Sequence, residues 1–446
     1  MKILLINTPR SPENRILKFA PEPAKPFIHR RLIGPPLGLM TIAAAVKDHD
    51  VILIDTKGEF DLTSEPPSLA GLVNRLVGEF KPDIIASSAI TSELYYAFEI
   101  FSEAKKIDPS IIAVLGGLHP TLLPYDCFHP AVDIVCPGQS AHIFRDVVDA
   151  IEKKSPLEAI PGILLNNGIT LKRTAGKVRM LDPANAGFLM PERAALKKWI
   201  STYKVGGSPD PSTYVYTSLG CPYKCTFCSI WPQFKGRYYQ RTIDSLITEL
   251  QSIPDYPVVR FADANTIVDL NFMNALFDRI LEDGIKKTFV MDIRADVAAQ
   301  NPSIIRKMAK GGLKVVICGF ESYRDEDLKK YHKDSPASDI AKAIKVFDDN
   351  NIMIRGNYVI PNDYSEDDFK SLEEYSSNNP VVYAGYTILT PMPGTVFYKQ
   401  VKHQIIDHDY LKYNFFNSVM RTTLPYEKFH ERVGSLWLIK KGKDVI

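Results

Sequence analysis

The first third of the chain alternates short apolar runs with segments whose apolar residues recur at helical spacing. The apolar runs, rich in β-branched residues, are residues 2–7, 51–55, 83–88 and 111–117. The segments with helical periodicity are residues 37–49, 68–80, 92–107 and 142–154. Strands alternating with helices of about ten to fifteen residues are typical of βαβ units. We therefore expect residues 1–153 to form a doubly wound, Rossmann-like α/β domain around a parallel sheet.

The alternation stops at residues 154–209 and then resumes. Residues 162–173 are expected to form a hairpin that turns at Asn166, Asn167 and Gly168, within a connector rich in loop-forming residues. The next expected strands are residues 214–218, 258–262, 288–293, 314–320, 352–360 and 381–389. Six βα units over residues 210–395 predict a partial (β/α)6 barrel. Residues 396–446 are expected to form a short, mostly helical extension.

Composition narrows the partners and the location that can be expected. The chain has 446 residues, of which 45% are hydrophobic and 24% charged, as in a globular protein of two domains. Its formal charge is only +2, and no basic run appears, so nucleic acid is not an expected partner. No apolar stretch reaches about eighteen residues, and the first residues turn polar too early for a signal peptide. We expect no membrane span and a cytoplasmic location.

Three of the six cysteines are crowded onto one predicted loop, directly after a predicted strand. Cys221, Cys225 and Cys228 form a CxxxCxxC pattern, and the aromatic Phe227 precedes the last cysteine. Three thiolates at the carboxyl end of a barrel strand can hold three irons of a 4Fe-4S cluster and leave the fourth iron open to a small molecule. The alternative is a structural zinc site, but no fourth Cys or His follows at a short spacing.

The remaining cysteines are Cys127, Cys136 and Cys318, which are far apart in the sequence. A free cysteine is most often a small core residue, so each is expected to be buried. They give no indication of a second cluster.

The cysteine loop and its aromatic residue resemble the radical S-adenosylmethionine (SAM) superfamily. The resemblance implies a 4Fe-4S cluster on the three cysteines and SAM held by polar residues at the ends of later barrel strands. The SAM-binding residues that it implies are Phe227, Asp263, Asn265, Arg294, Gly319 and Glu321. Asn265 departs from the pattern, because many members of the superfamily carry a second Asp there. Asp263 and Arg294 could instead pair with each other inside the barrel.

An open α/β domain before such a barrel resembles the cobalamin-binding subfamily. Glycine, serine and threonine at strand ends allow close approach and hydrogen bonds to a macrocycle and its tail. The implied cobalamin-binding residues are Pro36, Leu37, Ser88, Thr91, Ser92, Gly117, His119, Thr121, Gly138 and Gln139. Many members have Gly-Glu-Gly-Glu where this chain has residues 138–141, and the Asp-x-His-x-x-Gly motif is absent. The cobalt ligand therefore stays open, and His119 is either a ligand or a histidine in a turn.

Together the two resemblances imply a cobalamin-dependent radical SAM C-methyltransferase. Its reaction would use a 5′-deoxyadenosyl radical, methylcobalamin and an external electron donor to methylate an unactivated carbon. The expected substrate, bound at the domain interface, is a peptide or protein residue, a natural product or a lipid, with a glutamine of methyl-coenzyme M reductase as one candidate. Two alternatives stay open: a cobalamin-dependent radical SAM cyclase or rearrangement enzyme without methyl transfer, and a non-catalytic iron-sulfur protein.

Overall fold

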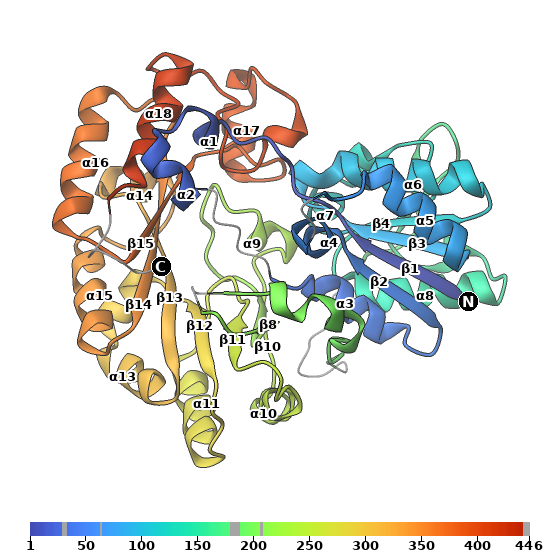
Figure 1. The fold of residues 1–446 in the computed structure, drawn as a ribbon, viewed down its shortest axis with the longest axis horizontal. Coiled ribbons are helices and arrows are strands. Elements are labelled where there is room, and N and C mark those ends of the chain that lie inside the picture. Colours follow the sequence, from blue (N-terminus) through green and yellow to red (C-terminus); the bar gives the residue numbers. More distant parts are fainter. Residues whose placement is uncertain (29–33, 63–64, 179–187, 206–207, 440–446) are drawn as a thin grey trace. The chain divides into compact units, whose positions relative to one another are not determined.

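The computed structural model describes residues 1–28, 34–62, 65–178, 188–205 and 208–439. The chain divides into two compact units (Figure 1). Unit 1 comprises Met1–Pro12 and Ile33–Tyr203, and unit 2 comprises Glu13–Leu32 and Lys204–Ile446. Within the described ranges, none of the helices combines the length and the apolar character that crossing a bilayer requires.

Unit 1 contains a seven-stranded sheet. Its strands, in spatial order, are β2 (Asp50–Asp55), β1 (Lys2–Asn7), β3 (Ile84–Ser88), β4 (Ile112–Gly116), β5 (Ile134–Val135), β6 (Leu164–Asn166) and β7 (Leu171–Arg173). The first five are parallel, and the last two are antiparallel. Because β1 lies between β2 and β3, the strand order reverses at β1. Ligands of such sheets bind beyond the carboxyl ends of the strands at this reversal.

Helices cover both faces of this sheet (Figure 1). The longer helices are α3 (Leu37–Ala45), α5 (Leu69–Phe80), α6 (Leu94–Ile107) and α8 (Ser140–Glu152), and the short ones are α4 (Thr56–Leu62) and α7 (Leu118–Leu122). In β1, residues 3–6 are completely buried, as expected for a central parallel strand covered on both faces. On one face, Leu39 and Met40 of α3 and Phe144 of α8 pack with the strands in a single apolar cluster. The doubly wound domain predicted from the sequence is confirmed.

The expected connector is part of this unit. The predicted hairpin forms as β6 and β7, but β6 pairs with the edge strand β5 and so extends the sheet. Further along, Trp199 and Tyr203 are buried in the same apolar cluster as the strands. Separate boundaries at residues 153 and 209 therefore do not describe the fold. The periodicity of the sequence gives no sign that a short hairpin will continue a preceding sheet.

Unit 2 contains six parallel strands in sequence order. They are β8 (Ser212–Val215), β11 (Val258–Phe261), β12 (Thr288–Asp292), β13 (Leu313–Glu321), β14 (Met353–Ile360) and β15 (Tyr383–Ile388). The helices between them are α10 (Ile243–Ser252), α11 (Leu270–Glu282), α12 (Ala295–Gln300), α13 (Pro302–Lys310), α14 (Asp325–Lys330), α15 (Ser338–Asp349) and α16 (Glu366–Asn378). Each strand pairs only with its sequence neighbours in this sheet, so the predicted partial barrel is confirmed.

Two further parts of unit 2 lie outside the barrel strands. A small antiparallel ribbon, β9 (Ser218–Gly220) with β10 (Tyr238–Gln240), flanks the short helix α9 (Ile230–Gln233). The C-terminal extension carries α17 (Val396–Val401) and α18 (Tyr426–Leu436).

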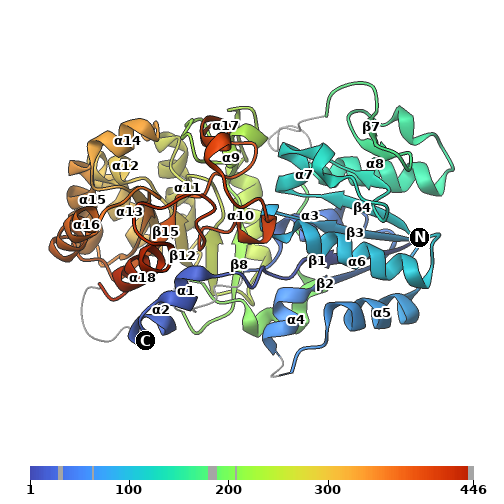
Figure 2. The ribbon, with the colours of Figure 1, turned by 90° about the horizontal axis from the view of Figure 1, so that it is seen from above.

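The N-terminal helices α1 (Arg15–Phe19) and α2 (Lys25–Ile28) also belong to unit 2. Helix α1 packs beside α18 (Figure 2). The backbone N–H of Ile16 donates to the carbonyl oxygen of Phe416 at 3.1 Å. This departs from the expected continuous domain of residues 1–153, because the chain leaves unit 1 after its first strand and returns later.

His430 ties α18 to the chain segment before it. Its Nε2 accepts a hydrogen bond from the backbone N–H of Ser418 at 3.1 Å, and its Nδ1 lies 2.7 Å from the carbonyl oxygen of Tyr426. Since a backbone N–H can only donate, Nε2 carries no proton, and the proton on Nδ1 is donated to Tyr426. Burial lowers the pKa of His430 to about 4, so the ring is neutral at neutral pH.

The stability of the fold should therefore fall as the pH decreases from about 6.5 to about 4. In this range the unfolded chain binds a proton at His430 that the folded chain does not, which costs on the order of 3 kcal/mol at the acid end. Chemical denaturation at a series of pH values measures the loss. His119 in unit 1 has a similarly lowered pKa, so the comparison is between the wild type and His430→Gln. An unchanged acid slope in this variant would show that His430 is not responsible.

Candidate active site

The cysteine loop follows the first barrel strand and the ribbon strand β9. Cys221 and Cys225 are buried and Cys228 is half-buried, and all three are free thiols. Gly220, immediately before Cys221, has a φ of +83°, and a Cβ there would lie 2.1 Å from the carbonyl oxygen of Arg237. Only glycine fits this position, so the turn that leads to the first cysteine is fixed by the sequence.

Neighbouring elements hold the loop in place. The indole Nε1 of Trp231 donates to the carbonyl oxygen of Cys225 at 2.9 Å. The backbone N–H of Thr226 donates to the carbonyl oxygen of Tyr331 at 2.9 Å. Phe227, expected to contact SAM, packs edge-to-face on the ring of Tyr331, with 5.5 Å between the ring centroids. The cysteines are therefore presented by an ordered loop.

Two positive charges near the loop partly offset the cost of burying its thiols as thiolates. Burial raises the pKa of the three thiols, whereas the positive charges of Lys333 and Arg294 oppose this shift at Cys221 and Cys225. Iron binding would replace the thiol protons. No three His, Cys, Asp or Glu side chains in the described ranges are arranged for one shared ion. A 4Fe-4S cluster binds each thiolate through a different iron, so it does not need such an arrangement.

A buried ion pair lies beside the cysteine loop. Glu321 ends β13, and its carboxylate is 2.8 Å from the ammonium of Lys333, which follows α14. The backbone of Glu321 has a φ of +62°, and a Cβ at Gly319 would lie 2.3 Å from the Glu321 carboxylate. Gly319 is thus needed for the position of Glu321. Sequence reasoning missed Lys333, since no motif marks it, yet its charge acts on the Cys225 thiol.

Arg294 also reaches the cysteine loop. Its guanidinium lies over the ring of Tyr223 at 3.9 Å from the centroid, and it forms an ion pair with Asp296 at 2.8 Å. The possible pairing of Arg294 with Asp263 is therefore wrong. Both residues nevertheless lie at the carboxyl end of the barrel, beside the segment that carries the cysteines.

Asp263 and Asn265 follow β11. The Asp263 carboxylate accepts three hydrogen bonds from Thr217 and Ser218, and burial raises its pKa to about 7. Asn265 donates to the carbonyl oxygen of Ile267, and its buried Oδ1 has no hydrogen-bond partner among the described residues. A cavity of about 390 Å³ opens here. Its lining is Ser218, Leu219, Gly220, Ile230, Gln233, Phe234, Ala262, Asp263, Ala264 and Asp292.

In unit 1, most of the residues expected to bind cobalamin gather at the ends of β3, β4 and β5. His119 Nδ1 lies 3.1 Å from Thr91 Oγ1, and Thr121 Oγ1 accepts from the backbone N–H of Gly138 at 2.8 Å. Ser88 ends β3, Ser92 follows Thr91 in the next turn, and Gln139 precedes α8. Pro36 and Leu37 are instead at the start of α3, with Pro36 as its N-cap residue.

The environment of His119 favours a histidine held in a turn. The side chain is buried, and burial lowers its pKa to about 4. Its Nε2 lies 3.8 Å from a carboxylate oxygen of Asp126. Both ring nitrogens thus face oxygen atoms of the protein.

The glycines of these loops serve the protein's own packing. A Cβ at Gly117 would lie 2.6 Å from the backbone nitrogen of Ala89, and one at Gly138 would lie 2.7 Å from a Val178 methyl carbon. Both glycines also have positive φ. Gly38, in the first turn of α3, differs from them, because a Cβ there would meet nothing within 4 Å.

A polar network that sequence reasoning missed lies at the ends of β1, β2 and β3. The buried Glu93 accepts from Thr8 Oγ1 at 2.7 Å and pairs with Lys57 Nζ at 2.7 Å. Asn7 donates to Asp55 at 2.7 Å. The three residues Thr8, Lys57 and Glu93 each follow a strand, a placement that the predicted sheet could have indicated.

Comparison with known families gives a different family for each unit. Residues 27–148 match the B12 binding domain family, and residues 215–375 match the radical SAM superfamily. The chain belongs to the cobalamin-dependent radical SAM enzymes of the methyltransferase type. The cofactors of this family are a 4Fe-4S cluster, SAM and cobalamin.

Two relatives of this radical SAM enzyme extend over most of its length. An uncharacterised methyltransferase of Pyrococcus horikoshii is 27% identical over 403 residues, which are 87% of this chain and 83% of that protein. The hopanoid C-3 methylase of Methylococcus capsulatus is 22% identical over 401 residues, which are 89% of this chain and 74% of that protein.

A solved structure shares the fold of this radical SAM enzyme. The radical SAM methyltransferase TsrM of Kitasatospora setae, solved with cobalamin and a 4Fe-4S cluster, has a TM-score of 0.67 at 15% identity. The likeness covers 90% of this chain and 75% of TsrM.

The residues of the radical SAM enzyme fit both kinds of cofactor. In unit 2, the donor set is three thiols on one ordered loop, which is the usual donor set of a cluster with one open iron. In unit 1, the open space at Gly38 and the strand-end hydroxyls leave room and hydrogen-bonding groups for a large ligand.

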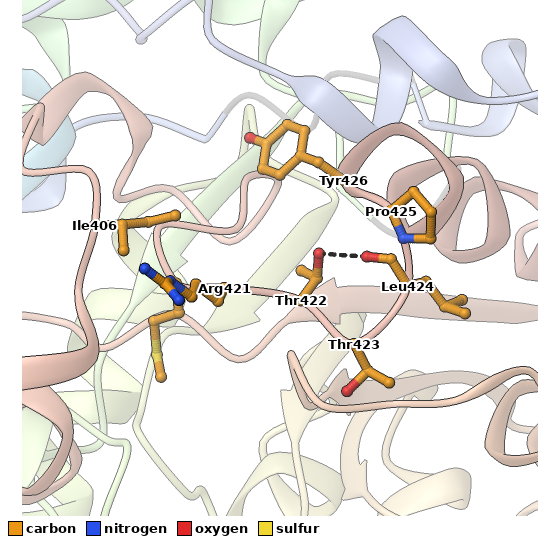
Figure 3. Close-up of a pocket in the computed structure, with 8 residues that line it drawn as sticks. Ile406, Arg421, Thr422, Thr423, Leu424, Pro425 and Tyr426 are labelled. Atoms are coloured by element: carbon orange, nitrogen blue, oxygen red, sulfur yellow. Dashed lines mark hydrogen bonds between the residues drawn. The ribbon is translucent and has the colours of Figure 1, made fainter.

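A second hollow, of about 370 Å³, lies on the C-terminal extension of the enzyme (Figure 3). Its lining is Ile406, Met420, Arg421, Thr422, Thr423, Leu424, Pro425 and Tyr426. The hydroxyl of Thr422 donates to the carbonyl oxygen of Leu424 at 2.7 Å, which stabilises the turn before α18. None of the residues expected to bind SAM or the cluster lies in this hollow.

Proposed function

We propose that the enzyme is a C-methyltransferase that methylates an unactivated carbon with SAM and cobalamin. The observation that carries the proposal is the group of charged side chains around the three-thiol loop, in a chain that also has a B12 binding domain. When bound, the cluster supplies an electron for SAM cleavage, and cobalamin supplies the methyl group.

The roles of the chain's own residues follow from their charges. Cys221, Cys225 and Cys228 would hold the cluster. The Glu321 carboxylate suits the ammonium of the SAM methionine, and the Lys333 ammonium suits its carboxylate. Since these two groups are paired with each other and buried, they are already oriented before SAM binds, which lowers the entropic cost of binding.

In unit 1, the proposed cobalamin site comprises the residues expected to bind cobalamin at the ends of β3, β4 and β5, together with Pro36 and Leu37 at the start of α3. Thr91, Thr121 and Ser88 supply hydroxyl groups there, while Gly38 leaves the helix backbone open to a large ligand. We place no axial ligand in this site, because the two ring nitrogens of His119 lie near oxygen atoms of Thr91 and Asp126.

The substrate belongs to the same proposal. A peptide or protein residue, a natural product or a lipid would each present an unactivated carbon, and a glutamine of methyl-coenzyme M reductase is the named candidate. An external one-electron donor completes the reaction.

An anaerobic assay with SAM, a chemical reductant and cobalamin tests the proposal. Methyl transfer to a carbon should produce 5′-deoxyadenosine and S-adenosylhomocysteine in equal amounts with each candidate substrate that is methylated. A cyclase or rearrangement enzyme would form 5′-deoxyadenosine without S-adenosylhomocysteine. A non-catalytic iron-sulfur protein would form neither product with any reductant, and either result would contradict the proposal.

A further inference from the structure

Asp263 forms hydrogen bonds to the backbone segment that leads into the cysteine loop, residues 216–218. One carboxylate oxygen, Oδ1, accepts from the backbone N–H groups of Thr217 at 2.8 Å and of Ser218 at 3.0 Å. The other oxygen, Oδ2, accepts from the Thr217 hydroxyl at 2.7 Å. Three of the roughly four acceptor positions of the carboxylate are thus used by this one segment.

A buried ion pair binds the carbonyl groups of the same backbone segment. Arg241 Nη1 donates to the carbonyl oxygen of Tyr216 at 3.0 Å. The backbone N–H of Arg241 donates to the carbonyl oxygen of Thr217 at 2.9 Å. The guanidinium pairs with Glu249 of α10 at 2.5 Å, and the two side chains are 0% and 1% exposed. The backbone N–H groups of the segment are therefore bound by Asp263, and its carbonyl groups by Arg241.

Burying the charged side chains of Asp263, Arg241 and Glu249 costs desolvation free energy, and a gain in folding stability alone does not account for their placement. An ion pair removed from water gains little over well-packed apolar side chains, and a buried carboxylate is tolerated only when hydrogen-bonded. What this arrangement does provide is a fixed backbone position. Ser218 begins β9 and lies only three residues before Cys221, and the turn at Gly220 between them accepts only glycine.

We propose that Asp263, together with Arg241 and Glu249, is a positioning residue that fixes the approach to the cysteine loop, and that Asp263 is not a SAM ligand. The inference rests on the proposed binding of the cluster by Cys221, Cys225 and Cys228. It reassigns the role that resemblance gave to Asp263, because the carboxylate is directed at the chain's own backbone.

The test uses the full-length protein with its cluster reconstituted and no substrate. In Asp263→Asn, the side chain loses its negative charge. In the orientation that keeps both backbone N–H bonds, they end on a neutral amide oxygen, and the amide NH2 can only donate to the Thr217 hydroxyl, so that bond is reversed. The electron paramagnetic resonance signal of the reduced, SAM-free cluster and its midpoint potential should both shift. Loss of iron to a chelator should be about tenfold faster, as expected when hydrogen bonds to a buried charge become bonds to a neutral group. The SAM dissociation constant should change by less than about threefold.

Two variants and one control separate this role from others. Thr217→Val removes only the hydroxyl bond and leaves the Asp263 carboxylate in place, so it should shift the signal in the same direction by a smaller amount. Glu249→Gln should also shift the signal, although Glu249 lies on α10 and acts on the segment only through Arg241. Asp269→Asn is the matched control, because Asp269 also accepts two backbone N–H bonds after β11 but caps α11.

Each outcome decides the inference. A weaker SAM affinity in Asp263→Asn with an unchanged SAM-free signal would show a SAM ligand and overturn it. If Thr217→Val and Glu249→Gln both left the cluster signal and its midpoint potential unchanged, the inference would be overturned even if Asp263→Asn failed to fold. A wild-type protein that binds no cluster would overturn the proposed function and this inference together. A wild-type protein that binds the cluster, with variants whose cluster signal is unchanged, would overturn the inference alone.

Discussion

Replacing Cys221, Cys225 and Cys228 together with alanine should abolish the iron content of the reconstituted protein and all reductive cleavage of SAM. The reason is that these thiols are on one ordered loop and are the only ligands proposed for the cluster. Each thiolate holds one iron, so the cluster loses every attachment to the protein. An iron count, the visible absorbance and the yield of 5′-deoxyadenosine measure the effect.

Cys318→Ala is the control for this triple variant. Cys318 is buried in β13, and burial raises its pKa to about 12, so it is a thiol rather than a thiolate at neutral pH. Its replacement should leave the iron content unchanged, apart from a loss of stability of about 1 kcal/mol for the small cavity. A triple variant that still binds four irons would contradict the assignment of the ligands.

Gly38→Phe should reduce the cobalt content of the protein at least about tenfold while leaving its iron content unchanged. A Cβ at this position meets nothing within 4 Å, so the fold can accept a side chain there. Replacing a helical glycine even favours the helix by about 0.5–1 kcal/mol. The ring would instead occupy the space in which the proposed cobalamin approaches α3.

Gly78→Phe is the matched control for the cobalamin site. Gly78 is an exposed glycine of α5 in the same unit, and a Cβ there also meets nothing within 4 Å. Gly78 lies near the end of α5, which leads into the amino end of β3. The start of α3 instead comes after the carboxyl end of β1 in the chain, so the two glycines lie toward opposite ends of the strands. Gly117→Ala is less informative, since its Cβ would collide with Ala89 and distort the loop whether or not cobalamin binds. Full cobalt occupancy in Gly38→Phe would exclude the start of α3 from the site.

The sequence predicts the strands well, because their burial follows directly from their composition. β1 is apolar at four consecutive positions and is the buried central strand, and the six barrel strands occur in their expected order. The three cysteines are also recognisable, since their short spacing places them on one loop without any knowledge of the fold. These features are local in the sequence.

What could not be predicted depends on contacts between distant segments. Lys333 meets Glu321 only because α14 turns the chain back, and Arg241 meets Glu249 and Tyr216 only in the folded barrel. The placement of α1 on α18 has the same origin, since α1 is too short to show a clear apolar face. The glycines at positions 117 and 138 are predicted to let cobalamin approach the backbone. The contacts that a Cβ would make there with Ala89 and Val178 depend on the fold and could not be predicted.

The pairing of α1 with α18 has a consequence for biosynthesis. The bond from Ile16 to Phe416 joins residues 400 positions apart, so unit 2 cannot close until residue 416 has left the ribosome. Strand β1 also needs β3, about eighty residues later, to be paired on both sides. Helix α1, which follows β1, has to wait for α18, so contacts of this range predict slow folding and a need for protection of the nascent chain.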